Sequence, residues 1–128
     1  MRVLVDAHVV VWVTIDDDRL PPAVRSLIAD GRTRVVLSVA TTWELMVKAL
    51  AGRLHLPEPP EDFFRGLIED FDYEVLPVEQ RHVDALPELP AIHGDPFDRM
   101  LVAQAIVEDL EIVTGDQAIA AYPVRTIW

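Results

Sequence analysis

The chain has 128 residues, no cysteine and a formal net charge of −11. This length is enough for one domain with its own core, and the lack of cysteine excludes a disulfide framework, a thiolate zinc site and a cysteine nucleophile. The apolar run from Val9 to Val13 is too short to cross a membrane, and no signal-peptide pattern is present. We therefore expect a cytoplasmic protein without membrane contact.

Five short apolar runs predict strands. The runs from Arg2 to Asp6 and from Arg34 to Ser38 are rich in β-branched residues and stop at a polar residue, which is typical of buried parallel strands. The other three are Tyr73 to Val78, Glu111 to Thr114 and Val124 to Ile127. Together they predict a parallel sheet of about five strands.

Helical patterns alternate with these strands. Pro21 and Pro22 open a helix over 23–30, and Thr41 opens another that closes at Gly52. Further helices are predicted over 61–71, 79–86, 97–110 and 117–122. This alternation favours an α/β fold in three layers, with helices flanking a central parallel sheet.

Four acidic residues fall where the carboxyl ends of the strands meet. Asp6 ends the first strand, Glu44 lies in the first turn of the predicted helix after the second, and Asp116 follows the strand that ends at Thr114. Asp98 begins the helix over 97–110 and reaches the same edge only if that helix starts there. Reactive groups of open parallel sheets gather at this edge.

Each acid also has an ordinary explanation at a helix start. Thr41 and Glu44 have capping-box spacing, and Asp95 followed by Pro96 and Asp98 is a good helix start. Asp6 and Asp116 suit N-cap positions in the same way. Taken singly, none of these residues requires a catalytic role.

Taken jointly, four such residues place four negative charges at one edge of a small sheet. Close carboxylates disfavour one another's ionised forms. A divalent cation relieves the repulsion, and oxygen ligands without cysteine favour Mg²⁺ or Mn²⁺. Because such ions activate water and hold phosphate oxygens, the pattern indicates a nuclease.

Four segments in this order resemble PIN-domain ribonucleases, specifically the VapC-type toxins of toxin–antitoxin pairs. They are Val3 to His8, Ser38 followed by Thr42 to Leu45, His93 to Arg99 running into Leu101 to Ala105, and Val113 to Asp116. The resemblance covers the whole chain and implies a single PIN-like nuclease domain over residues 1–128. It also implies hydrolysis of an RNA substrate, neutralisation by a small antitoxin protein, and a homodimer.

The resemblance assigns the principal metal-binding acids to Asp6, Glu44 and Asp98, with Asp116 as the fourth. The chain departs from the family at two positions. Ala7 stands where relatives often have Thr or Ser, and Gly115 stands where a larger, often basic residue is common. These departures bear on rate and substrate preference more than on the class of reaction.

Several further residues are candidates for supporting roles. Ser38 and Thr114 are expected to orient the acids or to satisfy strand-end backbone groups. His93 can approach the substrate or act as a local hydrogen-bond donor. Arg99 can hold a phosphate or pair with Asp95 four positions before it.

Three apolar residues and one histidine are expected to lie elsewhere. Trp43, Met46 and Leu50 are interpreted as core or dimer contacts. His8 can line the site, but a role facing the core or the solvent is favoured. The high negative charge repels RNA at long range, so bound cations in the acidic site and arginines at its rim, such as Arg53 or Arg99, must offset it locally.

Two other functions fit parts of the sequence. A non-catalytic, acidic PIN-like module that binds a basic partner protein keeps the fold without turnover. A phospho-acceptor receiver domain is also a small α/β protein with strand-end acids, but it needs a lysine near a late strand. The one lysine, Lys48, lies in an early helix, which argues against a receiver domain.

Overall fold

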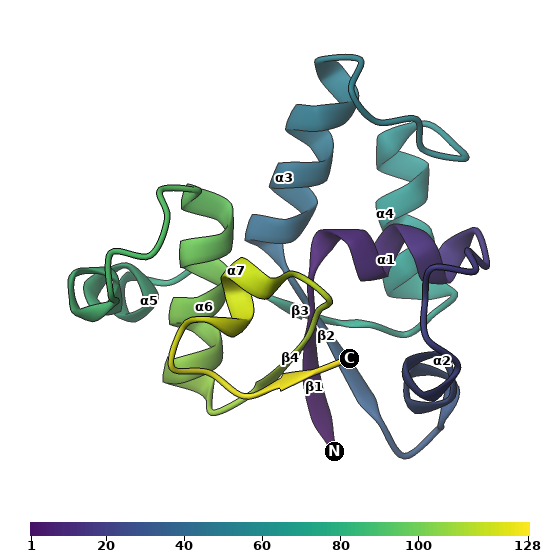
Figure 1. Ribbon diagram of the computed structural model, residues 1–128. Helices are drawn as coiled ribbons and strands as arrows, with labels where there is room; N and C mark the ends of the chain where they lie inside the picture. Colours follow the sequence, from purple (N-terminus) through teal and green to yellow (C-terminus); the bar gives the residue numbers. More distant parts are fainter.

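The computed structural model describes all residues 1–128, and a five-stranded parallel sheet lies at its centre (Figure 1). The strand order is β3-β2-β1-β4-β5, and every neighbouring pair is parallel. The strands are β1 (Arg2–Val5), β2 (Arg34–Ser38), β3 (Glu74–Leu76), β4 (Glu111–Val113) and β5 (Thr126–Ile127). The prediction of a five-stranded parallel sheet is confirmed, although β3 and β5 are shorter than expected.

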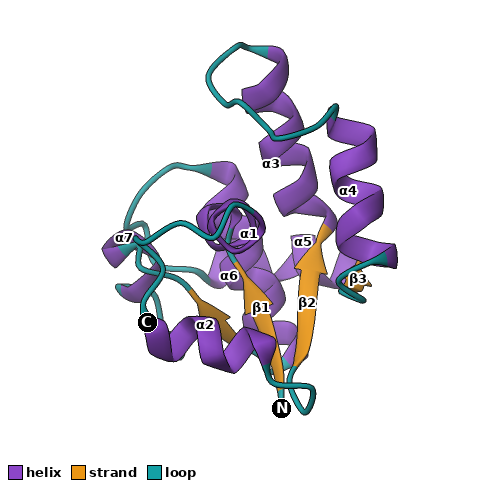
Figure 2. Ribbon diagram, turned by 90° about the vertical axis from the view of Figure 1, so that its right-hand side faces the viewer, coloured by secondary structure: helices purple, strands orange, loops and turns teal.

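Helices cover both faces of this sheet and complete the three layers (Figures 1 and 2). They are α1 (Ala7–Thr14), α2 (Pro22–Ala29), α3 (Val39–Leu50), α4 (Pro60–Glu69), α5 (Gln80–Ala85), α6 (Pro96–Glu108) and α7 (Gln117–Ala120), with one 3₁₀ turn, η1 (Leu86–Glu88). None of them combines the length and the apolar character needed to cross a bilayer.

The alternation of side chains along the strands divides the core in two. Val3 and Val5 of β1 pack into a cluster with residues of α1, α2 and α4. Leu4, between them, belongs to a second cluster with Ile112 of β4 and residues of α6. Because successive side chains of a strand point to opposite faces, one strand anchors both layers of helices and leaves its carboxyl end free for polar groups.

Helix α1 follows β1 directly and was not expected as a separate element. Its valines favour strands when judged by propensity alone. The carboxylate of Asp6 caps the helix by accepting a hydrogen bond from the Val9 amide at 3.0 Å, and Val9 and Val10 are buried. Capping and burial outweigh the local preference here.

Helix α3 begins two residues earlier than Thr41, at Val39, because Ser38 caps it by accepting a hydrogen bond from the Ala40 amide. Glu44 therefore lies in the second turn, so the capping-box explanation for Thr41 and Glu44 is wrong. Helix α6 starts at Pro96 with Asp95 as its cap, which is the start that Asp98 needs to reach the sheet edge.

The side chains of Trp43 and Leu50 on α3 are 61% and 78% exposed. Their interpretation as core residues is wrong, because helix α3 turns this side to the solvent. Trp43 packs edge-on against Phe97 of α6, with ring centroids 4.9 Å apart. Contact with a second copy remains a prediction for these residues.

Candidate active site

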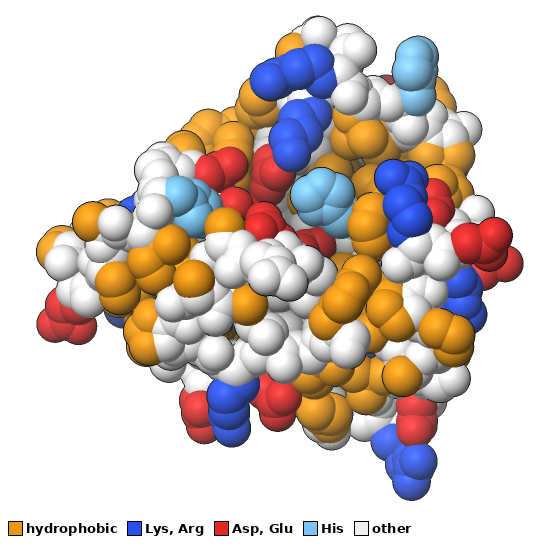
Figure 3. Space-filling model, viewed as in Figure 1, with side chains coloured by type: hydrophobic (Ala, Val, Ile, Leu, Met, Phe, Trp, Pro, Cys, Tyr) orange, Lys and Arg blue, Asp and Glu red, His pale blue; other side chains and the backbone are white.

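The carboxyl edge of the sheet carries a hollow of about 130 Å³ lined by all four predicted acids. Asp6 follows β1, Glu44 comes from α3, Asp98 from the first turn of α6, and Asp116 precedes α7. Figure 3 shows acidic side chains gathered in a depression of this face, with histidines beside them and basic side chains above. Residues far apart in the sequence thus meet at one edge of the sheet. We call the hollow that they line the acidic hollow.

Two of these acids do act as helix caps, as the ordinary explanation predicts. Oδ1 of Asp6 accepts from the Val9 amide, and Oδ1 of Asp116 accepts from the Ala118 amide at 2.8 Å. In each case the cap occupies one oxygen of the carboxylate and fixes the orientation of the side chain. Capping therefore positions these acids for the hollow without using up their second oxygen.

Asp95 is the third cap and stands beside Asp98. Its Oδ1 accepts from the amides of Phe97 at 2.9 Å and Asp98 at 3.1 Å. The carboxylate of Asp98 itself accepts no hydrogen bond from the protein, and the nearest basic atom is Nε2 of His93 at 3.8 Å. Both oxygens of Asp98 are therefore available to a ligand.

Glu44 pairs with the one lysine of the chain. Nζ of Lys48 lies 2.6 Å from Oε2 of Glu44, and Lys48 lines the hollow. Sequence reasoning missed this residue, although its spacing of four positions from Glu44 on a helix was the available signal. The ammonium group offsets part of the negative charge of the hollow.

The charge of the hollow perturbs one carboxyl strongly. Burial, followed by the negative charges of Asp95, Glu44, Asp116 and Asp6, raises the pKa of Asp98 to about 7. Both causes disfavour the ionised form, burial by desolvation and the neighbours by repulsion. A carboxyl of this kind gains most from a bound cation.

Thr114, the residue after β4, joins two of the acids. Its hydroxyl donates a hydrogen bond to Oδ2 of Asp6 and accepts one from the Asp116 amide at 3.0 Å. Ser38, by contrast, donates to the side-chain oxygen of Gln104 and forms no hydrogen bond with the four acids. Of the two predicted supporting hydroxyls, the structure places only Thr114 against the acids.

Two histidines lie at the rim. His8 is exposed and lines the acidic hollow, so it takes part in the hollow's wall and does not merely face the solvent. His93 accepts from the Asp95 amide through Nδ1 at 3.2 Å, which puts the proton of the neutral ring on Nε2. That nitrogen is buried without a hydrogen-bond partner and faces Asp98.

Arg99 has a structural role, because its side chain is engaged in hydrogen bonds within the protein. Its guanidinium donates to the carbonyl oxygens of Pro90 at 2.9 Å and Leu86 at 3.4 Å, and to the hydroxyl of Tyr122 at 3.1 Å. It forms no ion pair with Asp95, so that expected contact is absent. These bonds tie the segment after α5 to α6 and leave the guanidinium little freedom to hold a phosphate.

The donor set of the hollow fits a hard divalent cation. Asp98 offers two free oxygens, and Glu44 and Asp116 each keep one that accepts no hydrogen bond from the protein. The four carboxylates do not bring three oxygens within 4.8 Å of one another. Mg²⁺ suits this looser arrangement because it usually retains several of its own waters.

A tighter group of metal-ligand types lies elsewhere, where Glu79, His82 and Glu108 each place one atom within 4.8 Å of the others. Both ring nitrogens of His82 are engaged there, Nδ1 by the Glu79 amide at 2.9 Å and Nε2 by Glu108 at 3.1 Å. The guanidinium of Arg81 already pairs with both glutamates. This group is a satisfied ion-pair network that joins α5 to α6.

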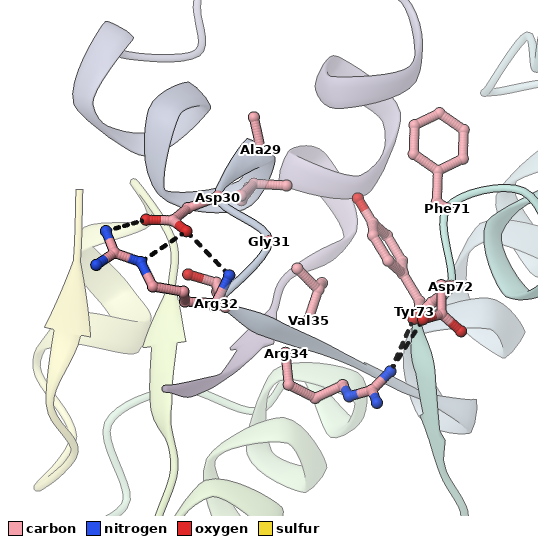
Figure 4. Close-up of a pocket in the computed structure, with 11 residues that line it drawn as sticks. Ala29, Asp30, Gly31, Arg32, Arg34, Val35, Phe71, Asp72 and Tyr73 are labelled. Atoms are coloured by element: carbon pink, nitrogen blue, oxygen red, sulfur yellow. Dashed lines mark hydrogen bonds and ion pairs between the residues drawn. The ribbon is translucent and has the colours of Figure 1, made fainter.

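The largest hollow of the molecule, about 480 Å³, lies at the opposite edge of the sheet (Figure 4). Its charged residues are paired with one another, Asp30 with Arg32 and Asp72 with Arg34. Burial raises the pKa of Tyr73 to about 12, and its hydroxyl has no partner. With its charges paired, this hollow offers no comparable catalytic group.

The parallel sheet and the acids at its carboxyl edge agree with one known protein family. The family model of the PIN domain matches residues 3–124, and the chain belongs to the PIN domain family. The acids that line the hollow all fall within the matched residues.

Particular relatives extend this assignment. Ribonuclease VapC22 of Mycobacterium tuberculosis (strain ATCC 25618 / H37Rv) is 29% identical over 131 residues, which cover 98% of each chain. VapBC2 from Rickettsia felis, in a structure bound to a DNA fragment from its promoter, matches with a TM-score of 0.74 at 13% identity, covering 99% of this chain and 98% of that one. VapBC-1 from nontypeable Haemophilus influenzae matches with a TM-score of 0.67 at 15% identity, covering 99% and 97%. At these identities the two structures establish the shared fold.

Proposed function

We propose that the protein is an endoribonuclease, dependent on Mg²⁺ or Mn²⁺, that acts as the toxin of a toxin–antitoxin pair. The observation that carries this proposal is the convergence of Asp6, Glu44, Asp98 and Asp116 on one hollow. Membership of the PIN domain family and similarity to a relative named a ribonuclease support it. We also propose that residues 1–128 form a single PIN-like nuclease domain and that the protein acts in the cytoplasm.

In this function Asp98, Glu44, Asp116 and Asp6 would hold the metal through their carboxylate oxygens. The ion would supply Lewis-acid stabilisation of a phosphate oxygen and a water of lowered pKa. Thr114 keeps Asp6 and Asp116 in register through its two hydrogen bonds. With a pKa of about 7, Asp98 is about half protonated at neutral pH, and a bound cation would favour its ionised form.

The net charge of −11 affects how strongly the protein attracts RNA and basic partner proteins. RNA is repelled at long range, so affinity for it must arise in and around the hollow. A small antitoxin with a basic segment would complement the same surface. We also propose a homodimer, for which the exposed Trp43 and Leu50 on α3 are candidate contacts.

A second candidate is a non-catalytic acidic module that binds a basic partner protein. One observation favours it, since the ammonium group of Lys48 already occupies Glu44 at 2.6 Å. A basic side chain from a partner protein would fit the remaining acids in the same way. This module would bind its partner and leave RNA intact.

Cleavage of a mixed RNA substrate by the purified protein separates the two functions. The nuclease requires added Mg²⁺ or Mn²⁺, stops with a chelator, and loses activity in Asp6→Asn. Asp72→Asn is a matched control, because Asp72 lies at the opposite edge and its left-handed backbone suits asparagine. Intact RNA under all metal conditions, or cleavage that survives chelation, contradicts the proposal.

A further inference from the structure

A second hollow, of about 370 Å³, opens beside the acidic hollow. It shares Asp6, His8 and Asp116 with the acidic hollow, so a group bound in it lies next to anything held by those acids. We call it the aromatic hollow. Its other lining residues are Trp12, Gly115 and Trp128.

Three rings form a row along this hollow. The ring centroids of Trp12 and Trp128 are 5.9 Å apart, and those of His8 and Trp12 are 5.7 Å apart. The guanidinium of Arg19 lies 4.7 Å from the centroid of Trp12 and pairs with Asp17. Trp12 is therefore held in place by its neighbours, whereas Trp128 is 47% exposed and offers aromatic surface to a ligand.

Gly115 creates the room for Trp128. A Cβ at position 115 would lie 2.5 Å from Cε2 of Trp128, closer than real contacts allow. The backbone of Gly115 is not left-handed, so the requirement is for space alone. The glycine that departs from the resembled family is thus the residue that lets an indole lie beside Asp116.

We propose that the aromatic hollow is a nucleobase subsite, in which a base next to the scissile phosphate of single-stranded RNA stacks on Trp128. This inference rests on the proposed ribonuclease function and names the form of its substrate. Unstacked bases of single strands pair readily with aromatic side chains, largely without regard to sequence.

The position of the aromatic hollow favours an RNA base as the occupant over a basic peptide, because the hollow adjoins the acids that would engage a phosphate under the proposed function. The net charge of −11 repels RNA at long range. RNA therefore requires an attraction that does not depend on charge, and stacking on Trp128 supplies one. The shared Asp6 and Asp116 place such a base beside the phosphate that the acids would engage.

Binding of an end-labelled oligoadenylate of about eight nucleotides, a length within the site sizes of single-strand binding folds, tests this subsite. Fluorescence anisotropy is measured with Mg²⁺ in an Asp98→Asn background, which keeps the RNA intact. Trp128→Ala should weaken binding about tenfold, the scale of one lost stacking contact, and Trp128→Phe should restore most of it. Phe71→Ala is the matched control, because Phe71 is 48% exposed at the opposite edge, and it should bind as the parent does.

Gly115→Ala provides an independent test through displacement of the indole. It should weaken binding in the parent and have no further effect in Trp128→Ala, because the Cβ then meets no ring. An additive loss in the double variant contradicts the proposal, as does equal RNA binding by Trp128→Ala and its parent. If Trp128→Ala weakens the binding of a basic peptide and leaves RNA binding unchanged, the aromatic hollow belongs to a protein partner. That result also overturns the proposal.

The subsite and the nuclease function fail in different ways. Metal-dependent cleavage by the wild type with unchanged RNA binding in Trp128→Ala overturns the subsite and leaves the nuclease. RNA binding that depends on Trp128, without cleavage under any metal condition, supports the subsite for RNA and overturns the nuclease.

Discussion

The hydroxyl of Thr114 donates a hydrogen bond to Oδ2 of Asp6 across 108 positions of sequence. The hydroxyl oxygen of Thr114 also accepts a hydrogen bond from the Asp116 amide, so this one side chain couples the end of β1 to the start of α7. The resembled family often has a hydroxyl residue where this chain has Ala7. In this chain Thr114 provides a hydroxyl to Asp6 from the neighbouring strand.

Thr114→Val should therefore destabilise the protein and slow RNA cleavage. The substitution leaves an oxygen of the buried Asp6 without its donor, which costs about 1–3 kcal/mol of unfolding free energy. Urea unfolding measures the loss, and cleavage assays measure the effect on rate. Thr114→Ser keeps the hydroxyl and should stay close to the wild type, so equal losses in the valine and serine variants would refute this role.

The raised pKa of Asp98 predicts that the free energy of unfolding of the metal-free protein, measured with a chelator, falls as the pH rises. The folded pKa of its carboxyl is about 7 and lies above its ordinary value of 3.8, so the folded state retains a proton that the unfolded state has lost. Stability from this group is full below about pH 4 and declines until the pH passes about 7. Above that, its ionisation in the folded hollow opposes folding.

Asp98→Asn should remove this dependence. We expect it to raise the free energy of unfolding of the metal-free protein by about 1–3 kcal/mol at pH 8 and to change it little at pH 4.5. Urea titrations of both proteins at the two values measure the difference. If the free energy of unfolding depends on pH in the same way in both proteins, other titratable groups cause that dependence.

Lys48→Gln should strengthen the binding of Mn²⁺. The ammonium group of Lys48 lies 2.6 Å from Glu44 and competes with a metal for that carboxylate. Its side chain is 37% exposed, so the solvent screens the effect, and we expect a gain of about threefold to tenfold. Isothermal titration calorimetry measures it, with Arg53→Gln as a control on an exposed residue that does not line the hollow. Weaker binding in Lys48→Gln would mean that Lys48 holds Glu44 in a metal-binding orientation.

His82→Ala should destabilise the protein without changing the number of metal ions bound. His82 is fully buried, and its ring bridges the Glu79 amide and Glu108. Loss of these bonds, together with the cavity, should cost about 2–4 kcal/mol. Thermal or urea unfolding tests the first part and calorimetry with Mn²⁺ the second. A lost binding step would identify Glu79, His82 and Glu108 as a metal site.

The sheet and the positions of most acids were predictable because they depend on local signals. A β-branched run followed by Asp6 encodes both the end of β1 and the cap of α1, and Asp95 with Pro96 encodes the start of α6. Since parallel strands direct their carboxyl ends to one edge, these local starts imply that Asp6, Asp98 and Asp116 share it. No distance between them was needed for that conclusion.

The contacts of the hollow required the tertiary structure. The hydrogen bond from Thr114 to Asp6 and the packing of the Trp128 indole on Gly115 join segments that the sequence keeps apart. Local signals indicate most of the elements, because capping and periodicity act within a few positions, but burial overrides the strand preference of the valines in α1. Which side chain meets which depends on how the finished layers pack, and that is decided only when the whole core closes.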